Sequence, residues 1–398
     1  IYQTTAFSFD NVQYAADLFD LKANGDIYTR LSNPTTNTLE ERLAMLEGGV
    51  GALAVSSGQS ASLIAILNIA KSGDEVVAST NMYGGTVNLL NVTLNKMGIK
   101  THFVSSDNAE DFEAQVTDKT RCIFVEMLNN PSLKIADVEN IALVAHKHNI
   151  RLIVDNTIPS PYLCRPIEFG ADIVVHSLTK YICGHGTSMG GVIIDSGNFD
   201  WVKSGKFPEL TEPDESYHGI TYTEAFGKGA YITKATVQLM RDLGSIQSPQ
   251  NAFYVMNGLE SLHVRMERHC KNALEIARFL KANDKVAWVD YPDLEDDKYH
   301  ALAEKYLPNG SCGVLSFAVK GGRDCAVKFM DSLKLCDIET HVADAKTCIL
   351  HPASHTHRQM TDEQLIEAGV APDLIRLSVG LENVDDLIAD ISQALDKI

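Results

Sequence analysis

The chain has 398 residues, 45% of them hydrophobic and 22% charged, which is ordinary for a globular protein and enough for two or three domains with a sizeable core. Its formal net charge of −18 excludes the basic surface that nucleic-acid binding needs, and it fits a cytoplasmic protein. No apolar run approaches the ~20 residues that cross a bilayer. No signal or transit segment is visible, and because the chain opens at Ile1 we expect some N-terminal residues to be absent.

The predicted elements alternate between helix and strand after an irregular start. Residues 1–40 are polar and make a poor core, which predicts an arm packed on something else. The alternation that follows predicts an α/β protein with a mostly parallel central sheet flanked by helices, and a ligand crevice at the carboxyl ends of its strands. We expect helices at 38–46, 60–70 and 86–97, and strands at 52–56, 75–79, 101–104, 121–126, 151–155, 173–176 and 191–194.

The second half of the chain breaks this rhythm. Residues 195–247 are rich in Gly, Pro, Tyr and acids, which predicts loops and short helices near the mouth of the site. Apolar residues at helical spacing predict one long helix over 251–281. The remainder mixes a strand at 314–319 with a helix at 384–395 and predicts a smaller C-terminal α/β domain. The expected division is therefore 1–40, 41–247 and 248–398.

Two strand ends carry complementary chemistry. The apolar run Asp172–His176 leads into a Ser-x-Thr-Lys turn that ends at Lys180, and the run from Arg151 ends at Asp155. A lysine amine that can form a Schiff base and a carboxylate that can pair with a pyridine nitrogen are what pyridoxal 5'-phosphate (PLP) requires. An isolated lysine would be read as a surface residue after a buried strand. The paired carboxylate favours a PLP site, with Ser177 and Thr179 placing hydroxyls near the phosphate.

Other strand ends supply the remaining parts of such a site. The turn Ser57-Gly58-Gln59 precedes a predicted helix, whose N-terminus can hold a phosphate. Tyr83 could stack on the pyridine ring and assist proton transfer, and Asn130 could hydrogen-bond the ring hydroxyl. Arg376, a lone arginine in an apolar run, suits a substrate α-carboxylate bidentately. Taken singly, the Ser57-Gly58-Gln59 segment could be an ordinary turn, Tyr83 a packed loop residue and Arg376 part of a structural ion pair.

Two other kinds of site are disfavoured. The histidines at 351, 355 and 357 resemble a metal cluster, but Pro352 prevents a single helical face and no Cys or acid lies at ligand spacing. The eight cysteines include no Cys-x-x-Cys pair, so we expect reduced thiols. The glycine-rich segment 184–191 precedes a strand instead of following one, which argues against a nicotinamide-binding dehydrogenase.

Together these residues resemble the Cys/Met-metabolism family of PLP enzymes, of the aspartate-aminotransferase-like fold type I. The likeness covers essentially the whole chain and is most specific over 172–191 and at Tyr28-x-Arg30 followed by Asn33-Pro34. It implies that residues 41–247 bind PLP. It also implies that Tyr28 and Arg30 reach a neighbour's cofactor phosphate, with Tyr28 near the substrate as well. The arm would then contact a neighbouring subunit in a homotetramer, a dimer of dimers with shared active sites.

Three stretches are similar to the O-acetylhomoserine sulfhydrylase branch of the family: 217–226, 343–354 and 361–370. Lyases of the family usually carry Glu where Lys346 stands, and methionine γ-lyases carry Cys where Gly85 stands. His341 and His355 depart from the family, which more often has Ser or Asn at the first position and Thr or Met at the second. Both are expected near the pocket lined by Arg376, where they bear on acceptor preference.

The resemblance implies a PLP-dependent γ-replacement that converts O-acetyl-L-homoserine and sulfide to L-homocysteine and acetate, in methionine biosynthesis. Lys180, Tyr83 and Asp155 are the expected catalytic residues, and no metal is expected. Cystathionine γ-synthesis or a methionine γ-lyase reaction stays open, as does a PLP-binding protein without catalysis. The sulfur donor could be sulfide, a methyl thiol or a sulfur-carrier protein, and the acyl group on homoserine is not specified.

Overall fold

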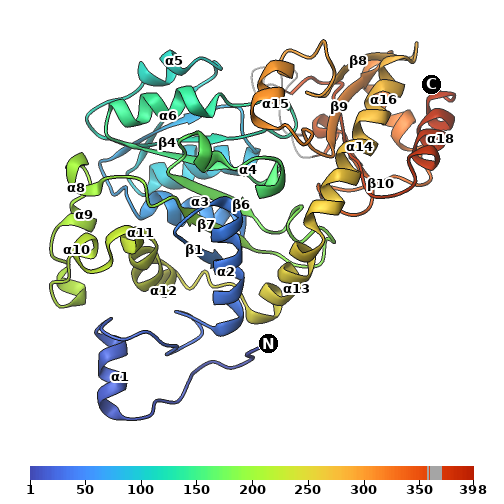
Figure 1. The fold of residues 1–398 in the computed structure, drawn as a ribbon. Coiled ribbons are helices and arrows are strands. Elements are labelled where there is room, and N and C mark those ends of the chain that lie inside the picture. The colour runs from blue at the N-terminus through green and yellow to red at the C-terminus, as the bar shows by residue number, and fades with distance from the viewer. Residues whose placement is uncertain (356–357, 359–369) are drawn as a thin grey trace.

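A seven-stranded sheet forms the centre of the molecule (Figure 1). The structure is a computed structural model and describes residues 1–355, 358 and 370–398. Strands β6, β5, β4, β2 and β3 pair in parallel, and only β7, between β1 and β6, runs against its neighbours. The predicted mostly parallel sheet is confirmed. The strands are β1 (Gly51–Val55), β2 (Glu75–Ser79), β3 (Lys100–Val104), β4 (Thr120–Glu126), β5 (Arg151–Asp155), β6 (Ile173–Ser177) and β7 (Gly191–Asp195).

The side chains of each strand alternate between two hydrophobic cores, one on each face of the sheet. Val125 and Val154 belong to the core that includes helices α6 and α14, whereas Phe124 and Ile153 belong to the core that includes α3. Because both faces are covered, the strands read as continuous apolar runs, as parallel strands do. The helices of this part are α2 (Pro34–Glu47), α3 (Gly58–Leu67), α4 (Gly84–Asn88), α5 (Ala109–Glu113), α6 (Val138–Lys147) and α7 (Ser160–Leu163), with α14 described below.

Side-chain caps set helix starts that the apolar pattern misses. Asn33 accepts a hydrogen bond from Thr35 N at 3.0 Å, so α2 begins at Pro34 and not at 38. Ser57 accepts one from Ser60 N at 3.1 Å, so α3 begins at Gly58 and not at 60. The predicted helix 86–97 begins as α4 and continues as a π-helix over Leu89–Leu94.

Residues 195–247 form loops and short helices, as predicted, and their expected position near the site mouth stays a prediction. Trp201, Phe207 and Tyr231 join the α3 core. The end of the stretch lies beside the Ser57 turn, because Ser56 N donates to Ser245 O at 2.9 Å. The helices are α8 (Trp201–Ser204), α9 (Pro208–Thr211), α10 (Tyr222–Phe226), α11 (Ala230–Lys234) and α12 (Arg241–Leu243).

The predicted long helix 251–281 is two helices, α13 (Pro249–Glu260) and α14 (Leu262–Lys281). Ser261 breaks the helix with a tight turn, because its N–H donates to Gly258 O and φ and ψ are −107° and 6°. Gly258 is required there, since a Cβ would lie 2.1 Å from Cys183 O. Figure 1 shows α13 and α14 in gold, running from the larger sheet toward the C-terminal part.

A five-stranded sheet of order β10-β11-β12-β9-β8 forms the C-terminal part. Its strands are β8 (Val286–Asp290), β9 (Val314–Val319), β10 (Asp337–Ile338), β11 (Cys348–Leu350) and β12 (Ile375–Ser378), and its helices are α15 (His300–Tyr306), α16 (Gly322–Met330) and α18 (Val384–Leu395). The predictions of a strand at 314–319 and a helix at 384–395 are confirmed. The expected boundaries at 40 and 247 stay predictions.

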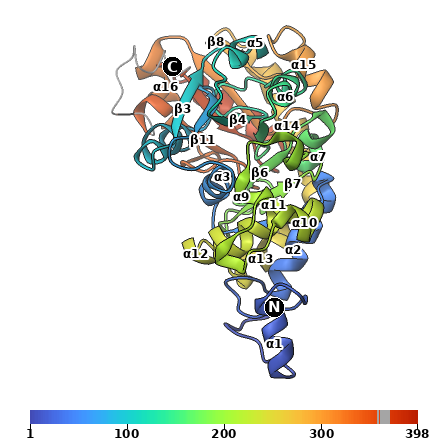
Figure 2. The ribbon, with the colours of Figure 1, turned by 90° about the vertical axis from the view of Figure 1, so that its left-hand side faces the viewer.

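The N-terminal arm extends from the rest of the chain. Figures 1 and 2 both show α1 (Val12–Phe19) projecting beyond the last elements of the larger part. All eight cysteines are free thiols. Within the described part of the chain, no helix is both long and apolar enough to span a membrane.

Candidate active site

Lys180 lies in the turn that follows β6, and the structure brings it to the carboxyl edge of the sheet. Its backbone N donates to Ser177 O at 3.2 Å, which folds the turn. The half-buried side chain directs Nζ to within 3.4 Å of His341 Nδ1. Burial, with the charge of Arg376 as a smaller cause, lowers the pKa of Lys180 to about 8. The amine is therefore far easier to deprotonate than an exposed lysine.

Asp155 ends β5, next to β6, and one of its two carboxylate oxygens is already held in place. Oδ1 accepts hydrogen bonds from Thr157 N at 3.0 Å and Thr157 Oγ1 at 2.5 Å. The same Thr157 hydroxyl accepts from Ser177 N at 2.8 Å, which ties Asp155 to the Lys180 turn. Burial raises the pKa of Asp155, although both Thr157 hydrogen bonds act to lower it. A cationic ring nitrogen beside the carboxylate would offset that burial, so Asp155 fits its predicted role.

Glu126, which the sequence reasoning missed, ends β4 directly opposite Asp155 in the strand register. It is buried, with Oε1 accepting from Tyr83 N at 2.6 Å and Oε2 accepting from Asn129 Nδ2 at 3.3 Å. Burial and the neighbouring Asp155 raise the pKa of Glu126. It thus connects Asp155 with two segments that were expected to contact the cofactor. An acid that ends an apolar run, as Asp155 does, was the signal that could have identified it.

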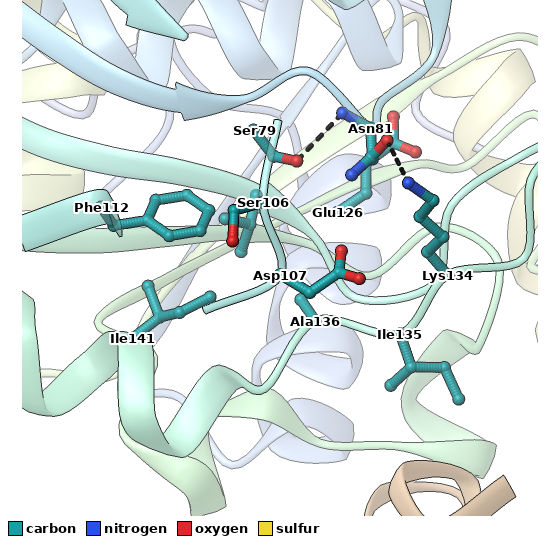
Figure 3. A pocket seen from close by; sticks show the side chains of 11 residues that line it. Ser79, Asn81, Ser106, Asp107, Phe112, Glu126, Lys134, Ile135, Ala136 and Ile141 are labelled. Atoms are coloured by element: carbon teal, nitrogen blue, oxygen red, sulfur yellow. Dashed lines mark hydrogen bonds between the residues drawn. The ribbon is translucent and has the colours of Figure 1, made fainter. Parts of the chain in front are cut away.

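Glu126 is one of the residues that line a small cavity of about 20 Å³ (Figure 3). Its polar lining includes Asn81, whose Oδ1 accepts from Lys134 Nζ at 3.0 Å, and Asp107. This volume is that of about one water molecule, so it cannot hold a substrate. None of the residues predicted to bind cofactor or substrate lines this cavity.

The Ser57-Gly58-Gln59 turn packs against the Lys180 turn. A Cβ on Gly58 would lie 2.7 Å from Ser177 Cβ, so only glycine allows this approach. The N-terminus of α3 therefore lies beside Ser177, and Thr179 Oγ1 accepts from Gly190 N at 3.2 Å. Backbone N–H groups at a helix start and nearby hydroxyls are suited to a phosphate. Gln59 Nε2 donates to Thr86 Oγ1 at 3.2 Å and joins this cradle to the Tyr83 loop.

Arg376, on β12 of the smaller sheet, is buried and only partly paired. Nη2 donates to His341 O at 2.7 Å and to Thr340 O at 3.3 Å, whereas the buried Nε has no hydrogen-bond partner among the described residues. Burial lowers the pKa of Arg376. A guanidinium with unsatisfied donors can receive a carboxylate bidentately. Asn130, which was expected to hydrogen-bond the cofactor, also has a buried side-chain oxygen, Oδ1, without a hydrogen-bond partner among the described residues.

Tyr83 lies close enough to Arg376 for its phenol to act on the guanidinium charge. Tyr83 is 54% exposed, and the exposed Tyr28 and Arg30 lie on the arm, with the guanidinium 5.0 Å from the Tyr28 ring. Neither arm residue hydrogen-bonds another predicted site residue in the described part of the chain. Their expected action on a neighbouring subunit stays a prediction.

The two unusual histidines behave differently. His341 lies at the site, as expected, because it contacts both Lys180 and Arg376. His355 is exposed, and its Nδ1 lies 3.4 Å from His351 N. The described residues contain no group of His, Cys, Asp or Glu that could hold a metal ion. His357 and residues 361–369 of the third sulfhydrylase-like stretch lie outside the described residues.

Known proteins resemble the chain over its full length. The family model described as Cys/Met metabolism PLP-dependent enzyme matches residues 1–396. An O-acetyl-L-homoserine sulfhydrylase of Leptospira meyeri is 51% identical, with 100% of this chain and 92% of the relative covered. A homocysteine synthase of Schizosaccharomyces pombe is 48% identical, covering 100% of this chain and 93% of the relative.

A solved structure agrees with these sequence relatives. The crystal structure of a candidate O-acetylhomoserine (thiol)-lyase from Campylobacter jejuni is 41% identical, with a TM-score of 0.96, and 100% of this chain and 94% of that chain are covered. That protein holds N'-pyridoxyl-lysine-5'-monophosphate. The fold, the full-length family match and the relatives agree: the chain belongs to the Cys/Met metabolism family of PLP-dependent enzymes.

Proposed function

We propose that this enzyme replaces the acetoxy group of O-acetyl-L-homoserine with sulfide, breaking the bond between Cγ and oxygen, and releases L-homocysteine and acetate. The observation that carries the proposal is the approach of Lys180 to the partly unpaired Arg376 at the edge of the larger sheet, with both groups contacting His341. An amine that accepts a proton and a clamp for an α-carboxylate are the two groups that an amino-acid substrate needs. The names of the relatives supply the substrate class.

Asp155, Arg376 and Lys180 have different roles in the proposed reaction. When bound, PLP supplies an electron-withdrawing ring that stabilises negative charge developing next to the substrate amino group. Asp155 holds the proton on the ring nitrogen, and Arg376 orients the substrate through its carboxylate. Lys180 Nζ takes the proton from the substrate Cα and moves protons at Cβ, for which its lowered pKa suits it. Acetate then leaves from Cγ, and sulfide bonds to the same carbon.

We infer that Tyr83 assists this proton transfer and covers the ring. Its backbone is anchored by Glu126, and a Cβ on Gly85 would lie 2.5 Å from Tyr83 Cε1. A side chain at position 85 would therefore displace the tyrosine ring. Glycine at position 85 is also one of the residues by which the chain resembles sulfhydrylases and not methionine γ-lyases, which typically carry Cys there.

The site is completed by a second subunit in this proposal. Tyr28 and Arg30 lie on the projecting arm, where exposed aromatic and cationic groups are available to a neighbour's phosphate. A homotetramer of paired dimers accounts for an arm that has little core of its own. Arg30→Ala should weaken PLP retention in protein that is still tetrameric, and unchanged retention would remove the support for shared sites.

A product assay tests the reaction. The PLP-loaded enzyme is given O-acetyl-L-homoserine with sulfide, with cysteine, or with no thiol. Homocysteine from the sulfide tube alone is the expected result. Cystathionine from the cysteine tube would instead indicate a cystathionine γ-synthase, and 2-oxobutanoate without thiol would indicate a lyase. A tube with O-succinylhomoserine shows whether acetate is preferred to succinate as the leaving group.

A further inference from the structure

His341 lies between the two charged groups of the proposed site and contacts each with a different part of the residue. Its side-chain Nδ1 is 3.4 Å from Lys180 Nζ. Its backbone carbonyl oxygen accepts from Arg376 Nη2 at 2.7 Å. One residue therefore touches the amine that moves protons and the guanidinium that would hold the substrate.

The surroundings of the ring indicate which nitrogen carries the proton. Nε2 lies 4.0 Å from Asp344 Oδ2 and has no hydrogen bond within the described residues. A nitrogen that faces a carboxylate is the one that keeps its hydrogen, so Nδ1 has the free lone pair. Burial and the charge of Lys180 lower the pKa of His341, which keeps the ring neutral.

The other titratable groups facing this pair leave that assignment intact. Arg376 is cationic and disfavours a second positive charge on the ring. Cys348 on β11 donates to His341 O at 3.3 Å, and burial raises the pKa of that thiol to about 12, so it stays neutral. Asp344 is then the only anion among the groups that act on the ring in the described structure.

We propose that His341 is a positioning residue that sets Lys180 relative to Arg376: its Nδ1 accepts a hydrogen bond from the Lys180 amine while its carbonyl fixes the guanidinium. The proposal rests on the proposed role of Lys180 as the PLP lysine. Because the carbonyl belongs to the backbone, a side-chain change at 341 removes the contact with lysine and keeps the contact with arginine. The two contacts can therefore be separated by experiment.

The test compares two variants of His341 by a readout that does not depend on turnover. His341→Asn places Oδ1 where the imidazole has Nδ1 and so keeps an acceptor, whereas His341→Ala removes it. The PLP-loaded proteins are titrated with base, and the midpoint of the change in the visible absorbance of the lysine-bound cofactor is recorded. His355→Ala is the matched control, since His355 is the exposed one of the two unusual histidines.

An acceptor beside the lysine nitrogen favours its protonated form. The midpoint of His341→Ala should therefore fall by about one pH unit, a tenfold loss of proton affinity, which is the size expected for one hydrogen bond to a charged group. His341→Asn and His355→Ala should titrate like the parent enzyme. A second readout is the steady-state rate. In the alanine variant kcat should fall about tenfold, because the pH midpoint of the lysine nitrogen shifts by about one unit. KM for O-acetylhomoserine should change less than about threefold, because the contact between the 341 carbonyl and Arg376 is intact.

Contrary results are distinguishable. An alanine variant that titrates like the parent enzyme would overturn the role of His341, and so would equal shifts in the alanine and asparagine variants. A parent enzyme that shows no visible band with PLP would overturn the assignment of Lys180, and with it the proposed function.

Discussion

Gly58 gives the sharpest test of the proposed phosphate cradle. In Gly58→Ala the new Cβ would lie 2.7 Å from Ser177 Cβ and 3.0 Å from Ser177 Cα. The first contact is shorter than carbon atoms tolerate and the second, which involves backbone, is tight, so the start of α3 and the Ser177 turn must move apart. Overpacking of this kind costs roughly 1–3 kcal/mol. If that cost falls on the PLP-bound form, the dissociation constant for PLP should rise about 5- to 150-fold.

The assay is a titration of the PLP-free protein with PLP, followed by cofactor absorbance. Gly229→Ala is the matched control: only Thr233 Oγ1, at 4.0 Å, lies near its Cβ, and the φ of −83° suits alanine. The control should bind PLP like the parent. Gly58→Ala protein that binds PLP with unchanged affinity would refute the cradle, provided that its thermal midpoint shows it to be folded.

Four further predictions follow from the site. Lys180→Ala should abolish turnover, measured as homocysteine release, and substantial retained activity would contradict the assignment. Asp155→Ala should keep the lysine-bound cofactor band but slow exchange of the substrate α-proton with solvent, so rapid exchange by NMR would contradict its role. Glu126→Ala should free Tyr83 N and lower kcat by about tenfold or more, whereas Glu126→Gln should retain most of it; equal rates would show that the anchor is not needed. Because the folded-state pKa of Lys180 is lowered from 10.5 to about 8, its penalty on the PLP-free protein is present below pH 8 and disappears toward pH 10.5. The pH dependence of urea unfolding should therefore differ between parent and Lys180→Met across that window, and identical curves would contradict a lowered pKa.

The positions of Lys180 and Asp155 at strand ends could be predicted from the sequence because they follow from local pattern. Lys180 and Asp155 each end an apolar run, and parallel strands bring such ends to one edge. Arg376 was singled out as a candidate carboxylate-binding residue because it is isolated among apolar residues. It is buried, and its Nε has no hydrogen-bond partner among the described residues. The alternation of helix and strand was likewise sufficient to predict the sheet.

What the sequence did not reveal depends on contacts between distant segments. Glu126 matters because Tyr83 N, 43 residues away, donates to it. The break at Ser261 depends on the close approach of Gly258 to Cys183 O, which no helical periodicity records. His341 was expected near the site, but its contact with Lys180 spans 161 residues and needed the placement of the smaller sheet beside the larger one.

The central claim is that Lys180 carries the cofactor at this sheet edge. The most direct measurement is to load the protein with PLP, reduce it with borohydride, digest it and locate the pyridoxyl-lysine by mass spectrometry. A single stoichiometric modification at Lys180 is expected. Modification at another lysine, such as Lys134 beside the small cavity, or no stoichiometric modification at all, would contradict it.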